Sequence, residues 1–267
     1  MRPCSEGEPG RRTLVLLHGF ALHSGIWGDW ISRLAPFVEP RAIDLPGHGR
    51  QSWDPRIGDL AGLAHAVSSE IPPGALLLGW SLGGMVALEL ARQRTDIRGL
   101  VLIATTPRFV TDADWPHGVE PRVLEAFARG VRDDYERTVQ DFLALQVMGA
   151  TDPRATLRAL RDSLRSRPAP DARGLDVGLE ILQRADLRAA LEGIGADTLV
   201  ITGQRDRIVH PAAGEALAAA LPHAQLRSIA GAGHAPFLSH PDAVHNQLAT
   251  FLDHVRQNGK RPARAVG

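Results

Sequence analysis

What the 267-residue chain lacks excludes several classes of protein. It has one cysteine, Cys4, so no disulfide can form within the chain, which suits a reducing compartment. Its 30 Lys and Arg residues balance 30 Asp and Glu residues, so no net charge draws it to nucleic acid or to an acidic membrane. No apolar run approaches the roughly 20 residues of a membrane span, and the polar N-terminus has no apolar signal core. We therefore expect a cytoplasmic protein that binds neither nucleic acid nor membrane.

Motifs for phosphates, dinucleotides and metals are also missing. The glycine-rich stretch at residues 79–84 has no lysine of the kind that a P-loop needs, and no Gly-x-Gly-x-x-Gly follows an apolar run. His240 and His245 do not have the spacing of metal ligands. We expect no metal and no cofactor, so any chemistry must come from side chains.

The most informative stretch is residues 76–87, Leu-Leu-Leu-Gly-Trp-Ser-Leu-Gly-Gly-Met-Val-Ala. An apolar run ends in Gly-x-Ser-x-Gly and passes directly into a helix former, which is typical of the nucleophile elbow of serine hydrolases. A sharp strand-to-helix turn strains the backbone of Ser81, so Gly79 and Gly83 must be nearly free of side chain. The alternative is a glycine-rich turn with an incidental serine, and the rest of the chain decides between the two.

Apolar runs that predict buried strands alternate with helical segments along most of the chain. Strands are predicted at residues 14–20, 41–45, 76–80, 100–104, 198–203 and 225–230. This alternation predicts an α/β fold with a mostly parallel central sheet flanked by helices. Between the fourth and fifth strands the sequence becomes rich in arginine and acidic residues, with helical patterns only, which predicts an inserted helical lid. The predicted division is a core of residues 13–106 and 188–255, a lid of residues 107–187, and flexible tails of residues 1–12 and 256–267.

A catalytic serine needs a base and an acid that orients the base. In α/β-hydrolases the chain order is serine, acid, histidine. Asp206 follows the predicted strand 198–203, and His234 lies in the loop after the last strand, so both fall at carboxyl ends of parallel strands, as Ser81 does. Asp206 could instead cap a helix, and most of the 11 histidines must be structural. We interpret His18 as a residue that braces its loop and His48 as a turn residue.

An oxyanion hole needs two converging backbone N–H groups. One is expected from Leu82, which follows the serine, and the other from Phe20, in the loop after the first strand. The helix that begins near Leu82 directs its positive end toward the same place. Both roles belong to the backbone, so side-chain replacement should disturb them only indirectly.

Two features of the predicted lid bear on the substrate. Arg154, Arg158, Arg161 and Arg165 recur on one helical stripe that only Asp162 interrupts, which suggests docking of an acidic macromolecule or a phosphate, unless the stripe is simply a solvated face. Residues 142–148, Phe-Leu-Ala-Leu-Gln-Val-Met, are either the lining of a tunnel for an aliphatic chain or lid core.

From about residue 13 to residue 255 the sequence resembles the pimeloyl-[acyl-carrier protein] methyl ester esterases of biotin synthesis, a family of α/β-hydrolases. The core motifs that carry the resemblance are LVLLHG at 14–19, DLPG at 44–47 and LGWSLGG at 78–84. Further motifs lie in the lid, at 137–139, 142–146, 148–149, 178–182 and 186–188, and near the candidate base, at 234–237 and 239–241. The lid motifs are the most telling, because lids vary most between hydrolase families.

The resemblance implies a role for each matching position. It makes Ser81, Asp206 and His234 the catalytic triad, with Phe20 and Leu82 at the oxyanion hole. It implies substrate contacts by Phe20, Ser81, Leu82, Phe142, Leu143, Leu145, Gln146 and His234. Arg137, Arg154 and Arg158 would meet the acyl carrier protein or its phosphopantetheine. Two positions depart from the family, which often has tryptophan at Phe20 and has a lid arginine where this chain has Asp141.

We therefore expect a monomeric serine carboxylesterase that removes the methyl ester of pimeloyl-acyl carrier protein. A general carboxylesterase or lactonase that acts on small free esters would use the same chemistry, with the lid serving only as a cover. A non-catalytic binding member of the fold is the third possibility, although a damaged triad would be its mark and all three members are present.

Overall fold

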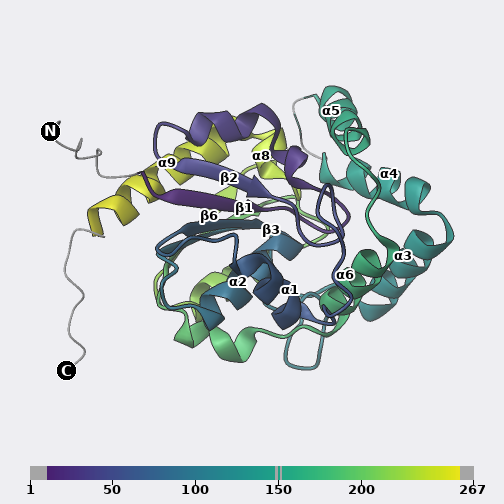
Figure 1. Ribbon diagram of the computed structural model, residues 1–267, viewed down its shortest axis with the longest axis horizontal. Helices are drawn as coiled ribbons and strands as arrows, with labels where there is room; N and C mark the ends of the chain where they lie inside the picture. The colour runs from purple at the N-terminus through teal and green to yellow at the C-terminus, as the bar shows by residue number, and fades with distance from the viewer. Residues whose placement is uncertain (1–10, 148–149, 151, 259–267) are drawn as a thin grey trace, which may run out of the picture.

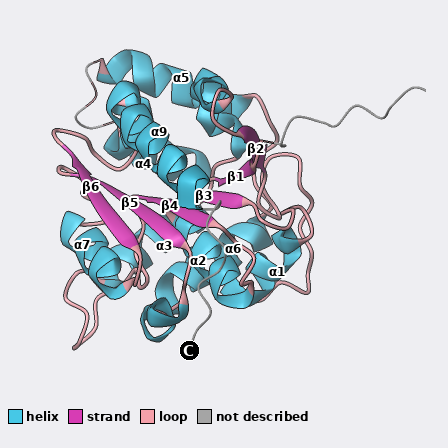
Figure 2. Cartoon of the chain, turned by 90° about the vertical axis from the view of Figure 1, so that its left-hand side faces the viewer, coloured by secondary structure: helices cyan, strands magenta, loops and turns pink. Residues whose placement is uncertain are grey.

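The computed structural model describes residues 11–147, 150 and 152–258. Their centre is one six-stranded, fully parallel sheet with the strand order β2-β1-β3-β4-β5-β6 (Figures 1 and 2). The strands are β1 (Thr13–Leu17), β2 (Glu39–Ile43), β3 (Leu76–Trp80), β4 (Gly99–Ile103), β5 (Asp197–Gly203) and β6 (Ala224–Ile229). The expected α/β fold with a parallel sheet is confirmed.

The position of each strand follows from its polarity. Every residue of β3 and β4 is buried, and these continuous apolar runs occupy the middle of the sheet. In the edge strands β2 and β6 every residue except the last is exposed or half-buried, and the two strands carry the charged Arg41 and Arg227. Charged side chains on an edge oppose pairing with a further strand.

Helices cover both faces of the sheet (Figure 1). One layer contains α1 (Leu60–Ser68), α2 (Leu82–Gln93) and α7 (Pro211–Ala220). The other contains the 3₁₀ segment η1 (Ser24–Leu34), the short α8 (Pro236–Ser239) and α9 (Pro241–Asn258). The helical spacing of Ile26, Trp27, Trp30, Ile31 and Leu34 predicts a helix after the first strand, but the structure has a 3₁₀ segment that Gly28, at φ 47°, interrupts with a kink.

Four further helices lie between β4 and β5 in the chain and gather at one end of the sheet, on the right of Figure 1. They are α3 (Pro121–Asp133), α4 (Tyr135–Gln146), α5 (Pro153–Arg165) and α6 (Ala172–Arg184), and the 3₁₀ turn η2 (Arg188–Gly193) then leads to β5. The sequence placed helices here at about 119–130, 131–148, 153–165 and 175–185. The side chain of Asp134 caps α4 by accepting from the N–H of Arg137, which explains the break between the first two.

The sequence also ended the last helix too early. Helix α9 continues to Asn258, three residues into the segment assigned to a flexible tail. Residues 1–10 and 259–267, the greater part of both predicted tails, lie outside the described residues, as does Met148 of the predicted apolar lid segment.

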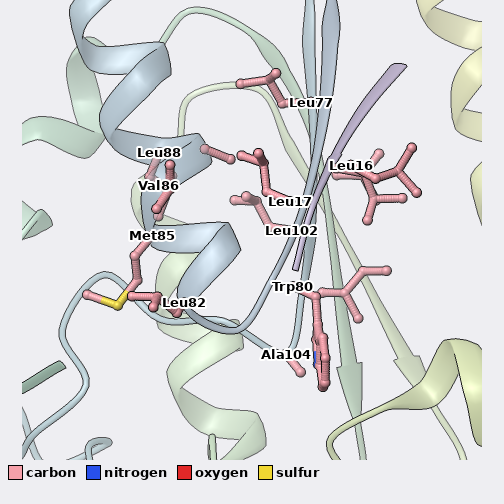
Figure 3. Packing of buried hydrophobic residues seen from close by; sticks show 14 of the residues in the cluster. Leu16, Leu17, Leu77, Trp80, Leu82, Met85, Val86, Leu88, Leu102 and Ala104 are labelled. Atoms are coloured by element: carbon pink, nitrogen blue, oxygen red, sulfur yellow. The ribbon is translucent and has the colours of Figure 1, made fainter. Parts of the chain in front are cut away.

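Apolar contacts on both sides of the sheet fix β1 and β4, the two neighbours of β3, which Ser81 directly follows. In Figure 3, Leu17 and Leu102 point toward Met85 and Val86 of α2, whereas Leu16 points to the other face. All five are completely buried. Since close packing leaves little room for movement, the carboxyl end of β3 is a rigid support for whatever follows it.

Candidate active site

Ser81 occupies the turn between β3 and α2 in a backbone conformation that side chains rarely adopt, with φ 55° and ψ −120°. The turn is so tight that a Cβ at Gly79 would overlap the carbonyl group of Gly83, and a Cβ at Gly83 would overlap the carbonyl oxygen of Leu17. Glycine is therefore required at both positions, for the steric reason that the sequence motif suggested.

Hydrogen bonds hold the strained turn in place. The N–H of Ser81 donates to the carbonyl oxygen of Ile103 at 3.0 Å, which continues the pairing of β3 with β4. The buried hydroxyl of Thr105 donates to the carbonyl oxygen of Ser81 at 2.7 Å. That oxygen also accepts from the N–H of Gly84 at 2.9 Å. The surrounding structure thus determines the conformation that projects the serine side chain.

Asp206 and His234 are brought together from two loops. Asp206 follows β5 and His234 follows β6, and Nδ1 of His234 lies 2.8 Å from Oδ2 of Asp206 with both side chains 1% exposed. The other carboxylate oxygen, Oδ1, accepts from the N–H groups of Ile208 and Val209 at 2.8 and 3.0 Å. The carboxylate therefore requires the proton on Nδ1 and leaves Nε2 as the basic nitrogen.

Nε2 of His234 is buried and has no hydrogen-bond partner among the described residues. Two contacts fix the loop that carries it: the N–H of Arg205 donates to the carbonyl oxygen of Ala232 at 2.8 Å, and Nε1 of Trp80 donates to the carbonyl oxygen of His234 at 2.8 Å. Trp80 directly precedes Ser81, so the histidine loop is tied to the serine turn. Nε2 makes no hydrogen bond to the Ser81 hydroxyl either, so the structure joins the acid to the base and leaves the base unpaired beside the serine turn.

Phe20 and Leu82, from which the oxyanion-hole donors are expected, both lie next to the serine turn. Leu82 is the first residue of α2, and Phe20 lies in the loop after β1, the neighbour of β3. A Cβ at Gly19 would lie 3.4 Å from Cβ of Ser81, so this loop is in contact with the serine. Within the described part of the chain, neither N–H donates to another protein group. Both donors remain available to a developing negative charge.

A cavity of about 140 Å³ contains Ser81. Its walls are mostly apolar and come from the loop after β1, from the serine turn, from the segment between β4 and β5 and from the loop after β5. They consist of Phe20, Ser81, Phe109, Val119, Val123, Leu124, Phe127, Phe142, Leu145, Leu182, Arg207 and Ile208. Larger cavities exist elsewhere, but none of those described contains a triad residue, so we assign the substrate to this one.

The predicted substrate contacts divide between wall and interior. Phe142 and Leu145 line the cavity, and edge-to-face and tilted ring contacts connect Phe142 through Phe127 to Phe20. Leu143 and Gln146 are fully buried and do not line it. The amide of Gln146 has no hydrogen-bond partner among the described residues, which is costly for a buried polar group.

Sequence reasoning missed the wall residues from α3 and α6, and also Arg207. Helical periodicity shows which residues of a helix are apolar, but not which of them face a cavity. The one available signal for Arg207 was its place beside Asp206 in the loop after the fifth strand.

His18 has the bracing role that the sequence suggested. Its Nε2 accepts from the N–H of Leu45 at 2.9 Å, and its Nδ1 lies 2.8 Å from the carbonyl oxygen of Gly19. Complete burial, together with the nearby His48, lowers the pKa of His18 to about 3. The ring is therefore neutral at physiological pH and connects β2 to the loop that carries Phe20.

The three arginines assigned to carrier docking lie on the inserted helices. Arg137 is on α4, Arg154 and Arg158 are on α5, and all three are exposed. Among the described residues none of them forms an ion pair, so their charges are available to a partner. Arg161 of the predicted stripe is only half exposed, and its Nε is buried.

In the part of the chain that the structure describes, no group of three or more His, Cys, Asp or Glu side chains is placed to hold a metal ion. No described helix has both the length and the apolar character needed to cross a membrane.

Solved structures share the fold. An esterase from Exiguobacterium antarcticum superposes with a TM-score of 0.80 at 19% sequence identity and covers 91% of this chain and 92% of its own. A bromoperoxidase from Bacillus anthracis gives a TM-score of 0.81 at 21% identity, with the same coverage. At such identities the likeness extends to the fold alone.

Sequence relatives are closer. The model of the alpha/beta hydrolase family matches residues 14–247. A pimeloyl-[acyl-carrier protein] methyl ester esterase from Stenotrophomonas maltophilia is 46% identical over 239 residues, which is 90% of this chain and 92% of the relative. One from Xanthomonas oryzae is 46% identical over 243 residues, or 91% and 95%. The chain therefore belongs to the alpha/beta hydrolase family and, within it, to the family of the pimeloyl-[acyl-carrier protein] methyl ester esterases.

Proposed function

We propose that this protein is a serine carboxylesterase that hydrolyses the methyl ester of pimeloyl-acyl carrier protein to pimeloyl-acyl carrier protein and methanol in biotin synthesis. The names of relatives at 46% identity across nine-tenths of the chain support this substrate. The observation that carries the chemistry is the buried pair of Asp206 and His234, with Nε2 of the histidine unpaired beside the serine turn.

The reaction proceeds in two halves. His234 takes the proton of the Ser81 hydroxyl as the oxygen attacks the ester carbonyl, and the N–H groups of Leu82 and Phe20 stabilise the tetrahedral oxyanion. The protonated histidine, held by Asp206, then gives its proton to the leaving methoxide, and methanol departs. A water molecule repeats the sequence on the acyl-enzyme and releases the carboxylate product.

The inserted segment supplies the substrate contacts in this proposal. Residues 107–187 form the lid, whose side chains Phe142 and Leu145 pack against the acyl chain in the Ser81 cavity. Arg137, Arg154 and Arg158 receive the acidic carrier protein on the outer surface, where their side chains are exposed. Leu143 and Gln146, which are buried and lie outside the cavity wall, support the chain contacts from behind.

The test compares kcat/KM for methyl pimeloyl-acyl carrier protein with kcat/KM for the same methyl ester freed of its carrier, with Ser81→Ala as the blank. We expect a large preference for the carrier-bound ester and a loss of several orders of magnitude in the blank. Near-normal turnover by Ser81→Ala would contradict the serine mechanism. Equal rates on the two esters would leave that mechanism standing and identify a general carboxylesterase.

Charge reversal tests the docking surface separately. Arg154→Glu and Arg158→Glu should lower kcat/KM for the carrier-bound ester and leave the free ester unaffected, because the change concerns only the encounter with the carrier. Arg98→Glu is the matched control. Arg98 is exposed beside the amino end of β4, whereas Ser81 lies at the carboxyl ends of the strands. Equal losses in all three variants would exclude a local docking surface.

A further inference from the structure

The wall of the Ser81 cavity contains one charged side chain, Arg207. Apart from Ser81 itself, every other residue of this wall is apolar. Arg207 is exposed, and no ion pair or side-chain hydrogen bond engages it among the described residues. An uncommitted guanidinium on an otherwise apolar wall is a recognition group for an anion.

The turn that holds the catalytic acid also fixes the position of Arg207. The N–H groups of Ile208 and Val209 both donate to Oδ1 of Asp206, so the backbone at residue 207 is clamped from either side. No ion pair joins Asp206 to Arg207 among the described residues, and the carboxylate of Asp206 instead accepts from these N–H groups at Oδ1 and faces His234 at Oδ2. Arg207 therefore lines the same cavity as Ser81, and its positive charge forms no ion pair with a triad residue.

The mouth of the cavity indicates which part of a substrate Arg207 meets. Val123 and Leu145, also on this wall, are 53% and 45% exposed and are the exposed large hydrophobic residues of the described chain. A substrate with its ester carbonyl at Ser81 lies against this wall, which presents aromatic rings, these two residues and Arg207. Since Ser81 and Arg207 line one cavity of about 140 Å³, a short acyl chain with its ester at Ser81 can present an anion at its other end to Arg207.

We propose that Arg207 binds the carboxylate at the far end of free half-esters of dicarboxylic acids, and so selects them as a further substrate class. The inference rests on the proposed ester hydrolysis at Ser81. Ser81 attacks the ester carbonyl, the bond between the carbonyl carbon and the methoxy oxygen breaks, and methanol leaves with the serine proton that His234 carries. Water then hydrolyses the acyl-enzyme: one of its protons returns to Ser81, and the new carboxylic acid releases the other. Arg207 takes no part in these bond changes and acts on binding alone.

The test uses two free esters of equal length, the monomethyl ester of pimelic acid and the methyl ester of pimelic acid monoamide, which is neutral. Wild-type enzyme should prefer the anionic ester, and Arg207→Gln should lower the ratio of the two kcat/KM values by about tenfold, mainly through KM. Arg207→Lys, which keeps the charge but loses the fork of donors, should retain part of the preference. High salt should weaken it in the wild type.

Arg205→Gln is the matched control. Arg205 is exposed in the same loop but lies outside the cavity wall, so its replacement should leave the ratio at the wild-type value. An unchanged ratio in Arg207→Gln, or an equal loss in Arg205→Gln, would overturn the inference. Thermal unfolding of each variant shows that the ratios refer to folded protein.

A second pair of substrates separates the carboxylate from the phosphate of a carrier arm. The values of kcat/KM are compared for methyl pimeloyl-phosphopantetheine and for methyl pimeloyl-pantetheine, which lacks the phosphate. If Arg207→Gln changes this ratio and leaves the half-ester ratio unaltered, the carboxylate assignment is wrong. These ratios are measured on free esters, so they do not depend on whether the carrier-bound ester is preferred, and the two proposals can fail independently.

Discussion

Ser81 shows how much of a catalytic site can depend on one strained residue. Its positive φ is maintained by the pairing of its N–H with β4 and by the Thr105 hydroxyl on its carbonyl oxygen. Strain of this kind costs on the order of 1–3 kcal/mol and persists only where neighbours over-determine the conformation. The neighbours here are buried strands, so the serine side chain has little freedom to turn away.

At the residue scale, Asp206→Asn should lower kcat by on the order of 10³–10⁴-fold, as loss of the orienting acid does in serine proteases. The amide would donate to Nδ1 of His234, so the ring proton would move to Nε2 and leave no base for Ser81. The measurement is kcat on a small methyl ester, with the rate of fluorophosphonate labelling of Ser81 as a second readout. A near-normal kcat would show that His234 is oriented by something else.

His18 predicts a pH dependence of stability. Burial depresses its pKa from 6.5 to about 3 in the folded protein, so the unfolded chain binds the proton first. The stabilisation by the neutral ring is complete above pH 6.5 and is lost as the pH falls toward 3, by about 1.4 kcal/mol per pH unit. The lowered pKa values of His23 and His48, also caused by burial, act in the same direction.

His18→Gln should therefore flatten the dependence of the unfolding free energy on pH by the contribution of one proton. Urea denaturation at about pH 6 and at about pH 4.5, both of which lie between the two pKa values, measures this. His65→Gln, at an exposed position on α1, should leave the wild-type slope. Parallel slopes for wild type and His18→Gln would show that the ring of His18 does not titrate as proposed.

At the scale of elements, one arginine fastens the inserted helices to the core. Arg167 follows α5, and its Nη1 lies 2.6 Å from Oδ1 of Asp44 and 2.8 Å from the Ser24 hydroxyl. Burial alone would raise the pKa of Asp44, but N–H donation from Arg50 and Ser24 holds it below its usual value, and Arg167 adds to this effect. Asp44, which directly follows β2, is thus a charged anchor for Arg167 and the inserted helices, more than 100 residues later in the chain.

Arg167→Met should lower the unfolding free energy by about 1–3 kcal/mol, because it leaves the carboxylate of Asp44 without its charged partner. It should also raise KM, since α5 and α6 would be less firmly held over the site. Arg173→Met is the control: its pair with Asp171 is solvent-exposed, and such pairs contribute at most about 1 kcal/mol. Equal effects of the two variants, by urea denaturation and steady-state kinetics, would contradict the anchoring role.

At the scale of the whole molecule, we predict a monomer. Among the described residues the exposed large hydrophobics are Val123 and Leu145, both at the mouth of the Ser81 cavity, which leaves no apolar patch of the size that a stable dimer needs. Sedimentation equilibrium at micromolar concentration should give the mass of one chain. A mass of two chains that persists on dilution would contradict this prediction.

The core was more predictable than the lid, for a physical reason. A parallel strand buried on both faces must be a continuous apolar run, so β3 and β4 can be recognised in the sequence. The turn after β3 tolerates only glycine at positions 79 and 83, two residues on either side of Ser81. The lid helices depend on weaker signals. Asp134 ends one helix and begins the next. Helix α6 begins at Ala172, three residues before its predicted start. The kink at Gly28 leaves no sign in the spacing of the apolar residues around it.

The sequence by itself determined the sheet, the order of serine, acid and histidine along the chain, and the steric demand for glycine beside Ser81, because each follows from local polarity or local geometry. Only the tertiary structure decided which side chains surround the serine. Phe142 and Leu145 face the cavity whereas Leu143 and Gln146 face the interior, and Arg207 reaches the wall, because the packing of inserted helices against the carboxyl edge of the sheet sets these directions. Such packing brings together residues that are far apart in the chain, so the local sequence does not predict it.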